Sequence, residues 1–352
     1  MRFGSSFLDR TKLVGMHFLV TGHTGFKGAW LTLLLQQRGH SVAGLALDPA
    51  PGSLFERAEL APTLVQDHRV DIRDRHAVRD VISASGADVI IHMAAQPLVR
   101  ESYRDPRYTY ETNVDGTLNV LDALAELTTL KATLIVTTDK VYRNDGRRSG
   151  YAESDALGGI DPYSTSKAMA DLLTQSWSTT AMTPIAIARA GNVIGGGDVC
   201  AERLIPDLVH AHQHGEATTL RNPDAVRPWQ HVLDCLDGYT AIVDALLEGR
   251  GAGAWNVGPA QADAKTVGEV ATAFLERLGG TPWRHVPDDG MTESHLLSLD
   301  SSHIANALGW SGRLHAETAV EWTADWHTTV GSRLTTARIA SELQIAQYEA
   351  LR

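Results

Sequence analysis

The chain is poor in cysteine, in long apolar runs and in positive charge, and each shortage excludes a class of protein. Its 352 residues include two cysteines, Cys200 and Cys235, which form neither a disulfide framework nor a CxxC metal motif. No apolar run approaches the roughly 18 residues that a membrane helix needs. We therefore expect free thiols, no metal site and no membrane contact.

The charge balance is acidic, with a formal net charge of -11. Nucleic-acid binding needs a basic face, so we expect no nucleic-acid partner. Residues 1–15 carry Arg2, Arg10 and Lys12 but no apolar segment, which argues against a signal peptide. Together with the expected free thiols, this indicates a cytoplasmic protein.

Short apolar runs alternate with longer helical patterns through the first half of the chain. We predict strands at residues 16–21, 41–47, 89–93, 133–137 and 185–190, with helices between them. A further strand before Asp71 counts as the third, so that 89–93 is the fourth and 133–137 the fifth. This alternation is typical of an α/β fold with a Rossmann-type doubly wound parallel sheet. We expect residues 1–190 to form this domain, with a segment near 228–258 returning to it. Residues 191–352 should form mainly a smaller α/β substrate-binding domain and C-terminal helices.

Three glycines, Gly22, Gly25 and Gly28, lie where the first strand should end and the first helix begin. Glycines at such a junction allow a tight turn and let the backbone approach a pyrophosphate at the helix N-terminus. The spacing departs from GxGxxG, because two residues separate the first two glycines. At a first βα junction the motif predicts dinucleotide binding, and the cofactor-binding residues then also include Thr24, Phe26 and Lys27.

Asp48 follows Gly28 by 20 residues, just beyond the second predicted strand. A carboxylate at this position suits the hydroxyls of the adenosine ribose and favours NAD over NADP. The alternative interpretation is a solvated loop acid before Pro49.

Two further groups of residues follow later strands and extend the predicted cofactor site. Asp71 and Ile72 follow the third strand and could meet the adenine. Ala94, Ala95 and Gln96 should close the fourth strand, where small residues permit close approach of the cofactor. Simple packing of the strand fits the two alanines equally well.

Tyr163 and Lys167 are four residues apart on a predicted helix that begins near Asp161, so their side chains should share one face. Tyrosine ordinarily ionises near pH 10, but a lysine ammonium and a positive nicotinamide ring would lower its pKa. Lys167 could also hold the nicotinamide ribose. Together with the glycine turn, the pair predicts nicotinamide-dependent hydride chemistry.

The segment Thr138-Asp139-Lys140 follows the fifth strand, which ends at Thr137, at the sheet edge where ligands bind in open α/β folds. We count Thr137 among the cofactor-binding residues, and the hydroxyl of Thr138 can bind a sugar hydroxyl. Asp139 and Lys140 form a candidate acid–base pair. The alternative is a capped strand end with two surface charges.

These residues stand in longer stretches by which the chain resembles the extended short-chain dehydrogenase/reductase family, and within it the nucleotide-sugar 4,6-dehydratases. The resemblance covers nearly the whole chain, roughly from Val14. The dTDP-glucose members typically carry GGAGFIG and an aspartate–glutamate pair where this sequence has GHTGFKG and Asp139-Lys140. The matching stretches are VTGHTGFKGAWL (20–31), HMAAQPLVRESY (92–103), TTDKVY (137–142), DALGGIDPYSTSKA (155–168), ARAGNVIGGGD (188–198) and RNPDAVRPWQHVLD (221–234).

The resemblance implies a lyase that dehydrates CDP-D-glucose to CDP-4-dehydro-6-deoxy-D-glucose, with NAD as a cofactor that is not consumed. By family position, Tyr163 with help from Thr138 removes the C4 hydroxyl proton while hydride leaves C4. Asp139 then protonates the C6 hydroxyl and Lys140 removes the C5 proton, before hydride returns to C6. An ammonium cannot abstract a proton, so Lys140 must act as a neutral base or stabilise the enolate while another group is the base.

The same resemblance implies that Asn192, Arg203 and Arg227 hold the sugar nucleotide, chiefly its diphosphate, which guanidinium groups suit. Surface salt bridging is the alternative for the arginines. We also expect a homodimer or homotetramer.

Two other functions share parts of the pattern. A nucleotide-sugar 4-epimerase has the glycine turn and the tyrosine–lysine pair but needs no acid–base pair beyond the threonine. A dinucleotide-sensing regulator on the same fold usually lacks an intact tyrosine–lysine pair.

Overall fold

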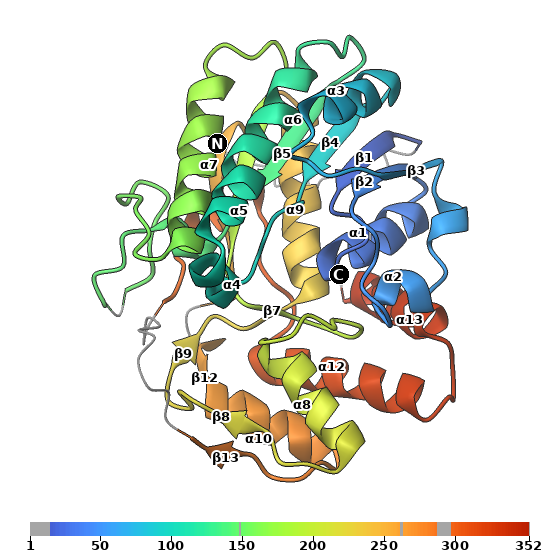
Figure 1. Ribbon diagram of the computed structural model, residues 1–352, viewed down its shortest axis with the longest axis vertical. Coiled ribbons are helices and arrows are strands. Elements are labelled where there is room, and N and C mark those ends of the chain that lie inside the picture. Colours follow the sequence, from blue (N-terminus) through green and yellow to red (C-terminus); the bar gives the residue numbers. More distant parts are fainter. Residues whose placement is uncertain (1–14, 148, 261–262, 287–296, 352) are drawn as a thin grey trace, which may run out of the picture.

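A parallel sheet of seven strands forms the centre of the computed structural model, which describes residues 15–147, 149–260, 263–286 and 297–351 (Figure 1). The N-terminal residues 1–14, on which the absence of a signal peptide was argued, lie outside these ranges. Every neighbouring pair of strands in the sheet runs parallel. The order across the sheet is β11 (Gly253–Val257), β6 (Ile185–Ala190), β5 (Ala132–Val136), β4 (Val89–His92), β1 (His17–Thr21), β2 (Ser41–Ala46) and β3 (Gln66–Arg69).

Helices cover both faces of this sheet, which confirms the predicted Rossmann-type doubly wound fold (Figure 1). One face carries α3 (Arg75–Ala84), α6 (Gly116–Leu124) and α7 (Pro162–Ser178), with α4 (Val99–Arg104), α5 (Pro106–Tyr110) and a π-helical turn (Glu111–Asp115) leading into α6. The other face carries α1 (Phe26–Gln37), α9 (Val232–Leu247) and α11 (Ser302–Leu308), with α2 (Leu54–Arg57) and α13 (Ala337–Ala350) packed outside α1.

The strands follow from the apolar runs of the sequence. Every residue of β4, β5 and β6 is buried, as expected for central parallel strands that helices cover on both sides. The helix α3 is amphipathic, buries only Val78 and Ile82, and is capped by the Asp74 carboxylate.

A smaller lobe lies below the sheet in Figure 1 and has its own apolar core, which includes Leu208, Trp229 and Phe274. It consists of α8 (Leu204–His214), α10 (Val267–Leu278) and α12 (Ala316–Gly331) with three short strand pairs: β7 (Val193–Ile194) with β10 (Gln230–His231), β8 (Thr219–Leu220) with β13 (Arg284–His285), and β9 (Val226–Arg227) with β12 (Lys265–Thr266). Between these elements the chain returns to the sheet as α9 and β11.

Three predicted strand ends are wrong by one residue. β2 ends at Ala46 rather than Leu47, β4 ends at His92 rather than Met93, and β5 ends at Val136 rather than Thr137. Ala94 to Gln96, which were expected to close the fourth strand, form a loop beyond β4. The side chain of Thr21 explains the second difference. Its Oγ1 accepts hydrogen bonds from the amides of Met93 and Ala94, both at 3.1 Å, and this turns the chain away from the ladder.

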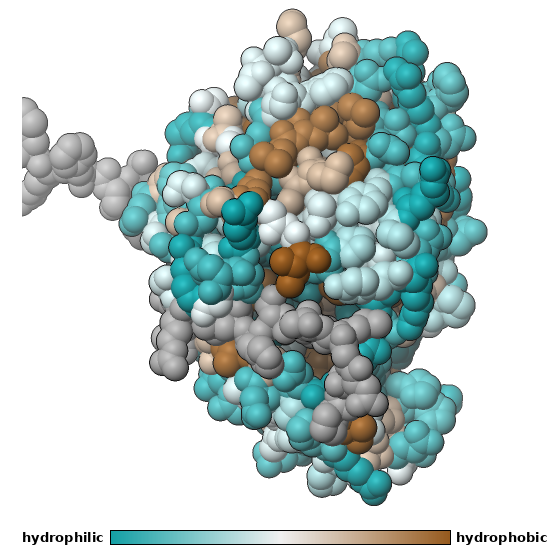
Figure 2. Space-filling model, turned by 60° about the vertical axis from the view of Figure 1, so that its left-hand side comes forward, coloured by the Kyte–Doolittle hydropathy of each residue, from teal (hydrophilic) through white to brown (hydrophobic). Residues whose placement is uncertain are grey.

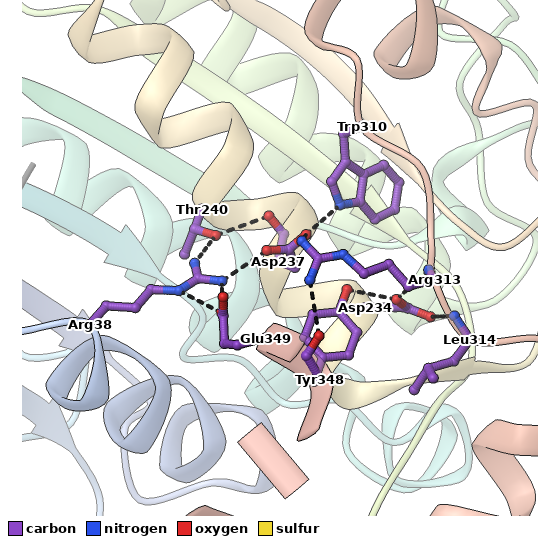
Figure 3. A network of polar contacts seen from close by, with 9 residues as sticks. All are labelled: Arg38, Asp234, Asp237, Thr240, Trp310, Arg313, Leu314, Tyr348 and Glu349. Carbon is purple, nitrogen blue, oxygen red and sulfur yellow. Dashed lines mark hydrogen bonds and ion pairs between the residues drawn. The ribbon is translucent and has the colours of Figure 1, made fainter. Parts of the chain in front are cut away.

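Polar side chains, among them the buried Asp234 and Asp237, fasten the C-terminal helix α13 to α1 and α9 (Figure 3). At the end of α1, the Arg38 guanidinium donates to Asp237 Oδ1 (2.9 Å) and Thr240 Oγ1 (2.7 Å) of α9 and to Glu349 Oε1 (3.0 Å) of α13. One turn before Asp237, the buried Asp234 carboxylate accepts from the hydroxyl of Tyr348 at 2.7 Å. A single cluster thus joins α1, α9 and α13.

The backbone amides of Arg313 (2.8 Å) and Leu314 (3.1 Å) also donate to the Asp234 carboxylate. Burial raises the pKa of this carboxyl group, and the amides and the Tyr348 hydroxyl oppose the shift. The amides of Arg313 and Leu314 and the hydroxyl of Tyr348 all donate to Asp234, and the loss of any one would destabilise its charged form.

We expect Tyr348→Phe to lower the free energy of unfolding by about 1–3 kcal/mol, the usual cost of leaving a buried acceptor without a donor. Urea unfolding followed by tryptophan fluorescence measures this change. Tyr103→Phe is the matched control, because the side chain of Tyr103 is largely exposed. Equal stabilities of the Tyr348→Phe protein and the wild type would show that the cluster does not hold α13.

Candidate active site

The glycine turn between β1 and α1 is too tight for any side chain at two of its three glycines. A Cβ on Gly28 would lie 2.2 Å from the carbonyl oxygen of Gly22 and 2.6 Å from Cα of His23. A Cβ on Gly22, whose φ is +75°, would lie 2.9 Å from the backbone of Ala94. The bare backbone and the N-terminus of α1 therefore form a cradle that fits the pyrophosphate of a dinucleotide.

The residues predicted to meet the adenosine lie at the far end of the sheet, beyond β2 and β3. Asp48 is exposed, and its carboxylate lies 3.7 Å from Nε of Arg69. Arg69 is also paired with Asp67 at 2.7 Å, so two carboxylates offset its charge. A guanidinium held in this way is a poor site for the extra phosphate of NADP, which agrees with the prediction of NAD.

His23, within the glycine turn, is a residue that the sequence analysis did not single out. Its buried ring lies where a Cβ on Gly44 would be, and its Nε2 bonds Asp67 Oδ1 at 2.9 Å. Thr24 donates to the carbonyl of Leu47 at 3.0 Å. Both contacts tie the glycine turn to the ends of β2 and β3.

Asp71 and Ile72 occupy different environments. The Asp71 carboxylate is paired with Arg73, which lowers its pKa. The side chain of Ile72 is buried against Gly116 at the start of α6. Only Asp71 of the two is thus partly open to solvent.

A buried asparagine, Asn113, in the π-helical turn before α6 holds the loop after β4 in place. Asn113 accepts from the Gln96 amide (2.8 Å) and donates to Ser166 Oγ (2.9 Å) on α7. The side-chain amide of Gln96 donates to Thr109 Oγ1 at 2.8 Å. π-Helical turns often mark functional sites, but no periodicity in the sequence reveals one, which is why Asn113 was missed.

Tyr163 and Lys167 lie in the first turns of α7, which starts at Pro162 and is capped by the Asp161 carboxylate. Lys167 Nζ donates to the carbonyl of Val136, the last residue of β5, at 2.8 Å. Burial and the nearby ammonium of Lys27 lower the pKa of Lys167 to about 8.

The expectation that Lys167 lowers the pKa of Tyr163 is wrong for the chain by itself. Burial raises the pKa of Tyr163 to about 12, and the opposing contributions come from Thr138 and Arg203 rather than from Lys167. The ammonium of Lys167 is turned toward Val136. Ionisation of the phenol near neutrality therefore requires a further positive group beside it, such as an oxidised nicotinamide.

The turn after β5 contains the candidate acid–base pair. Thr138 Oγ1 donates to Asp139 Oδ1 at 3.0 Å, while Asp139 Oδ2 is buried and has no partner among the described residues. Burial raises the pKa of Asp139, against the charges of Lys140 and Arg227. Asp139 is therefore a buried carboxyl group with one oxygen available for a ligand.

Two of the predicted substrate-binding residues lie near the catalytic candidates: Arg227 near the turn after β5 and Arg203 near Tyr163. Lys140 and Arg227 line the same cavity of about 30 Å³, together with Tyr142, Gly159 and Ser164. Arg203 is paired with Asp198 at 3.0 Å, and its charge helps to set the pKa values of Tyr163 and Lys27. Asn192 lies two residues beyond the end of β6, and its carbonyl accepts from the Gln230 amide at 2.9 Å.

The side chain of Lys27 extends toward the catalytic candidates. The sequence analysis counted this residue with the glycine turn. Its Nζ donates to the hydroxyl of Tyr239 on α9 at 2.9 Å. Burial lowers the pKa of Lys27, and Cys235 and Asp139 oppose the shift. Tyr239 was not foreseen, because 212 residues separate it from Lys27 in the sequence.

Fold and site together define a Rossmann-fold enzyme of the extended short-chain dehydrogenase/reductase type. Residues 18–258 match the model of the NAD dependent epimerase/dehydratase family. The chain belongs to this family.

Two curated relatives and one solved structure are similar to most of the chain. The CDP-glucose 4,6-dehydratase of Salmonella typhimurium is 39% identical over 91% of this chain and 92% of its own length. The dTDP-glucose 4,6-dehydratase 1 of Escherichia coli is 25% identical over 89% and 92%. The dTDP-glucose 4,6-dehydratase DesIV of Streptomyces venezuelae, solved with NAD, has a TM-score of 0.77 at 25% identity, covering 96% of this chain and 100% of its own.

We expect Gly28→Ala to abolish measurable binding of NAD in isothermal titration calorimetry, since the new methyl group would enter the cradle beside Gly22. Gly331→Ala is the matched control, because a Cβ at Gly331 meets nothing within 4 Å. Undiminished NAD binding by a folded Gly28→Ala protein would contradict the cradle.

Proposed function

We propose that the chain dehydrates CDP-D-glucose to CDP-4-dehydro-6-deoxy-D-glucose, with NAD held in the first domain. The main support for this proposal is that two pairs of catalytic candidates lie at the same edge of the sheet. Tyr163 and Lys167 on α7 suit oxidation at a sugar carbon, and Asp139 and Lys140 after β5 suit elimination of water. An enzyme that only transfers hydride has no use for the second pair.

The oxidation depends on the tyrosine. Tyr163 takes the proton of the C4 hydroxyl while Thr138 holds that hydroxyl, and Lys167 holds the nicotinamide ribose. When bound, NAD would supply the acceptor for the C4 hydride and the source of the hydride that C6 receives. The residues of the glycine turn, Asp48, Asp71 and the loop at Ala94 to Gln96 bind the cofactor in this proposal.

The elimination depends on the turn after β5. The 4-ketone makes the C5 proton acidic, Lys140 removes it, and Asp139 gives a proton to the leaving C6 hydroxyl. The raised pKa of Asp139 supports this role, because it favours the protonated acid that the leaving group needs. If Lys140 instead stabilises the enolate, another group removes the C5 proton.

Substrate binding falls mainly to residues 191–352, and cofactor binding to residues 1–190 with the segment near 228–258. Arg203, Arg227 and Asn192 hold the diphosphate in this proposal. Arg227 supports it by lining the same cavity as Lys140. The choice of cytidine is supported by the 39% identity to the Salmonella typhimurium enzyme, whose name specifies CDP-glucose.

We also propose that the protein is a cytoplasmic homo-oligomer. The compartment is supported by its two free cysteines. The assembly is supported by an apolar patch on the outer face of α6 and α7, where Leu118, Met169 and Leu172 are exposed. Figure 2 shows apolar side chains gathered in the upper half of this side of the molecule. Patches of this kind commonly mark protein–protein contacts.

The test is a panel of CDP-, dTDP-, UDP- and GDP-glucose, each incubated with the protein and NAD. CDP-glucose should give a 4-keto-6-deoxy sugar, detected by its absorbance in alkali, at the highest kcat/KM of the four. Tyr163→Phe should lower this rate by about 10²- to 10⁴-fold, the usual contribution of a general base. Preference for another nucleotide would overturn the choice of cytidine, and a CDP-galactose product would favour the epimerase.

Exchange of the C5 proton with deuterated water tests Lys140 separately. Lys140→Met should slow this exchange and the formation of product by about 10²-fold or more, because the group that removes the proton is lost. Formation of NADH in a single turnover should persist. Lys131→Met is the control, since Lys131 is an exposed lysine at the opposite end of β5, paired with Asp88. Undiminished exchange in Lys140→Met would assign the base to another group.

A further inference from the structure

A fully buried ion pair joins β6 to α7 behind the active site. The Arg189 guanidinium donates through Nε to Asp171 Oδ2 at 2.8 Å and through Nη2 to Asp171 Oδ1 at 2.7 Å. The two side chains are 1% and 0% exposed. A buried pair of this kind is a poor source of stability, because the cost of removing both charges from water offsets their attraction. A pair that adds little stability can still fix the position of β6 relative to α7.

Two further hydrogen bonds of the pair reach the two ends of the turn after β5, while others go to the carbonyl of Glu153 and the side-chain amide of Gln175. At one end, Thr137 Oγ1 donates to Asp171 Oδ2 at 3.0 Å. At the other end, Arg189 Nη1 donates to the hydroxyl of Tyr142 at 2.9 Å, and the guanidinium lies 5.1 Å from the centre of the tyrosine ring. Asp139 and Lys140 lie between these two attachment points.

The hydroxyl of Tyr142 is also fixed from the opposite side. It donates to Asn256 Oδ1 on β11 at 2.6 Å, while Asn256 Nδ2 donates to the carbonyls of Tyr151 (2.7 Å) and Asp300 (3.0 Å). Burial raises the pKa of Tyr142 to about 12, so the phenol keeps the proton it donates. The hydroxyl therefore has one position, set by Arg189 and Asn256.

Asp171 stands on the same helix as the oxidising pair. Tyr163, Lys167 and Asp171 follow one another at intervals of four, so they share one face of α7. A group bound to Asp171 is thereby held at a fixed distance from Tyr163.

We propose that Arg189, Asp171 and Tyr142 are positioning residues that clip the turn 137–142 to α7. The clip keeps Asp139 and Lys140 in register with Tyr163 and Lys167, so that one bound sugar meets both pairs. This inference rests on the proposed function. Oxidation uses Tyr163 and Lys167 of α7, with Thr138 close to the end of β5, whereas elimination uses Asp139 and Lys140, which lie nearer to Tyr142. Loosening the clip at Tyr142 should therefore impair elimination selectively.

Tyr142→Phe tests the clip by removing one hydroxyl and keeping the ring. We expect formation of the keto sugar to fall by about 10²-fold, the effect of displacing catalytic groups by about 1 Å. The single-turnover rate of NADH formation from CDP-glucose and the KM should stay near wild-type values, so that bound NADH accumulates. Backbone amides of residues 138–142 should also exchange with deuterium faster.

Tyr151→Phe is the matched control. The rings of Tyr142 and Tyr151 are stacked 5.4 Å apart, but the Tyr151 hydroxyl bonds Asn144 and Asp145 rather than Arg189. Its elimination rate should be that of the wild type. Arg189→Lys, which keeps a positive charge for Asp171 but removes the nitrogen that bonds Tyr142, should reproduce the selective loss. This variant is the test if Tyr142→Phe does not fold.

Three results would overturn the clip: wild-type elimination in Tyr142→Phe or Arg189→Lys, equal loss of NADH formation and elimination, or the same loss in Tyr151→Phe. Failure of the proposed function gives a different result. In that case the wild-type protein forms neither NADH nor keto sugar from CDP-glucose.

Discussion

The direction of the strands is the constraint on which the site depends. Because all seven strands of the central sheet run parallel, their carboxyl ends share one edge. The glycine turn after β1, the loop after β4, the Thr138–Lys140 turn after β5 and Asn192 after β6 all lie there. A motif at each strand end thus becomes part of one site, although more than 160 residues separate the first from the last.

Exclusion of water sets the chemistry at this edge. For Lys27, Asp139, Tyr163 and Lys167, burial is the largest cause of the pKa shift, and it favours the neutral form of every group. The carboxyl and the phenol hold their protons more tightly, and the two lysines hold theirs less tightly. A site of this kind keeps an acid protonated, but it needs a bound positive charge to ionise its tyrosine.

Much of the fold was predictable because its signals are local. The continuous apolar runs of β5 and β6 and the Asp161-Pro162 start of α7 predicted these elements to within a residue or so. The glycine turn was predictable because only glycine fits a backbone that passes 2.2 Å from the point where a Cβ would be. The end of β4 was not, since the hydroxyl that turns the chain there belongs to Thr21, more than 70 residues earlier.

The sequence by itself determined which residue types stand at each strand end: three glycines after β1, an aspartate and a lysine after β5, and a tyrosine and a lysine one turn apart on α7. Only the tertiary structure decided how these groups are charged and what holds them. The pKa of Tyr163 depends on burial by distant segments, and the turn at Asp139 is tied to α7 through Arg189, which comes 50 residues after it. Desolvation and long-range hydrogen bonds are properties of packed neighbours, and no local pattern in the chain encodes them.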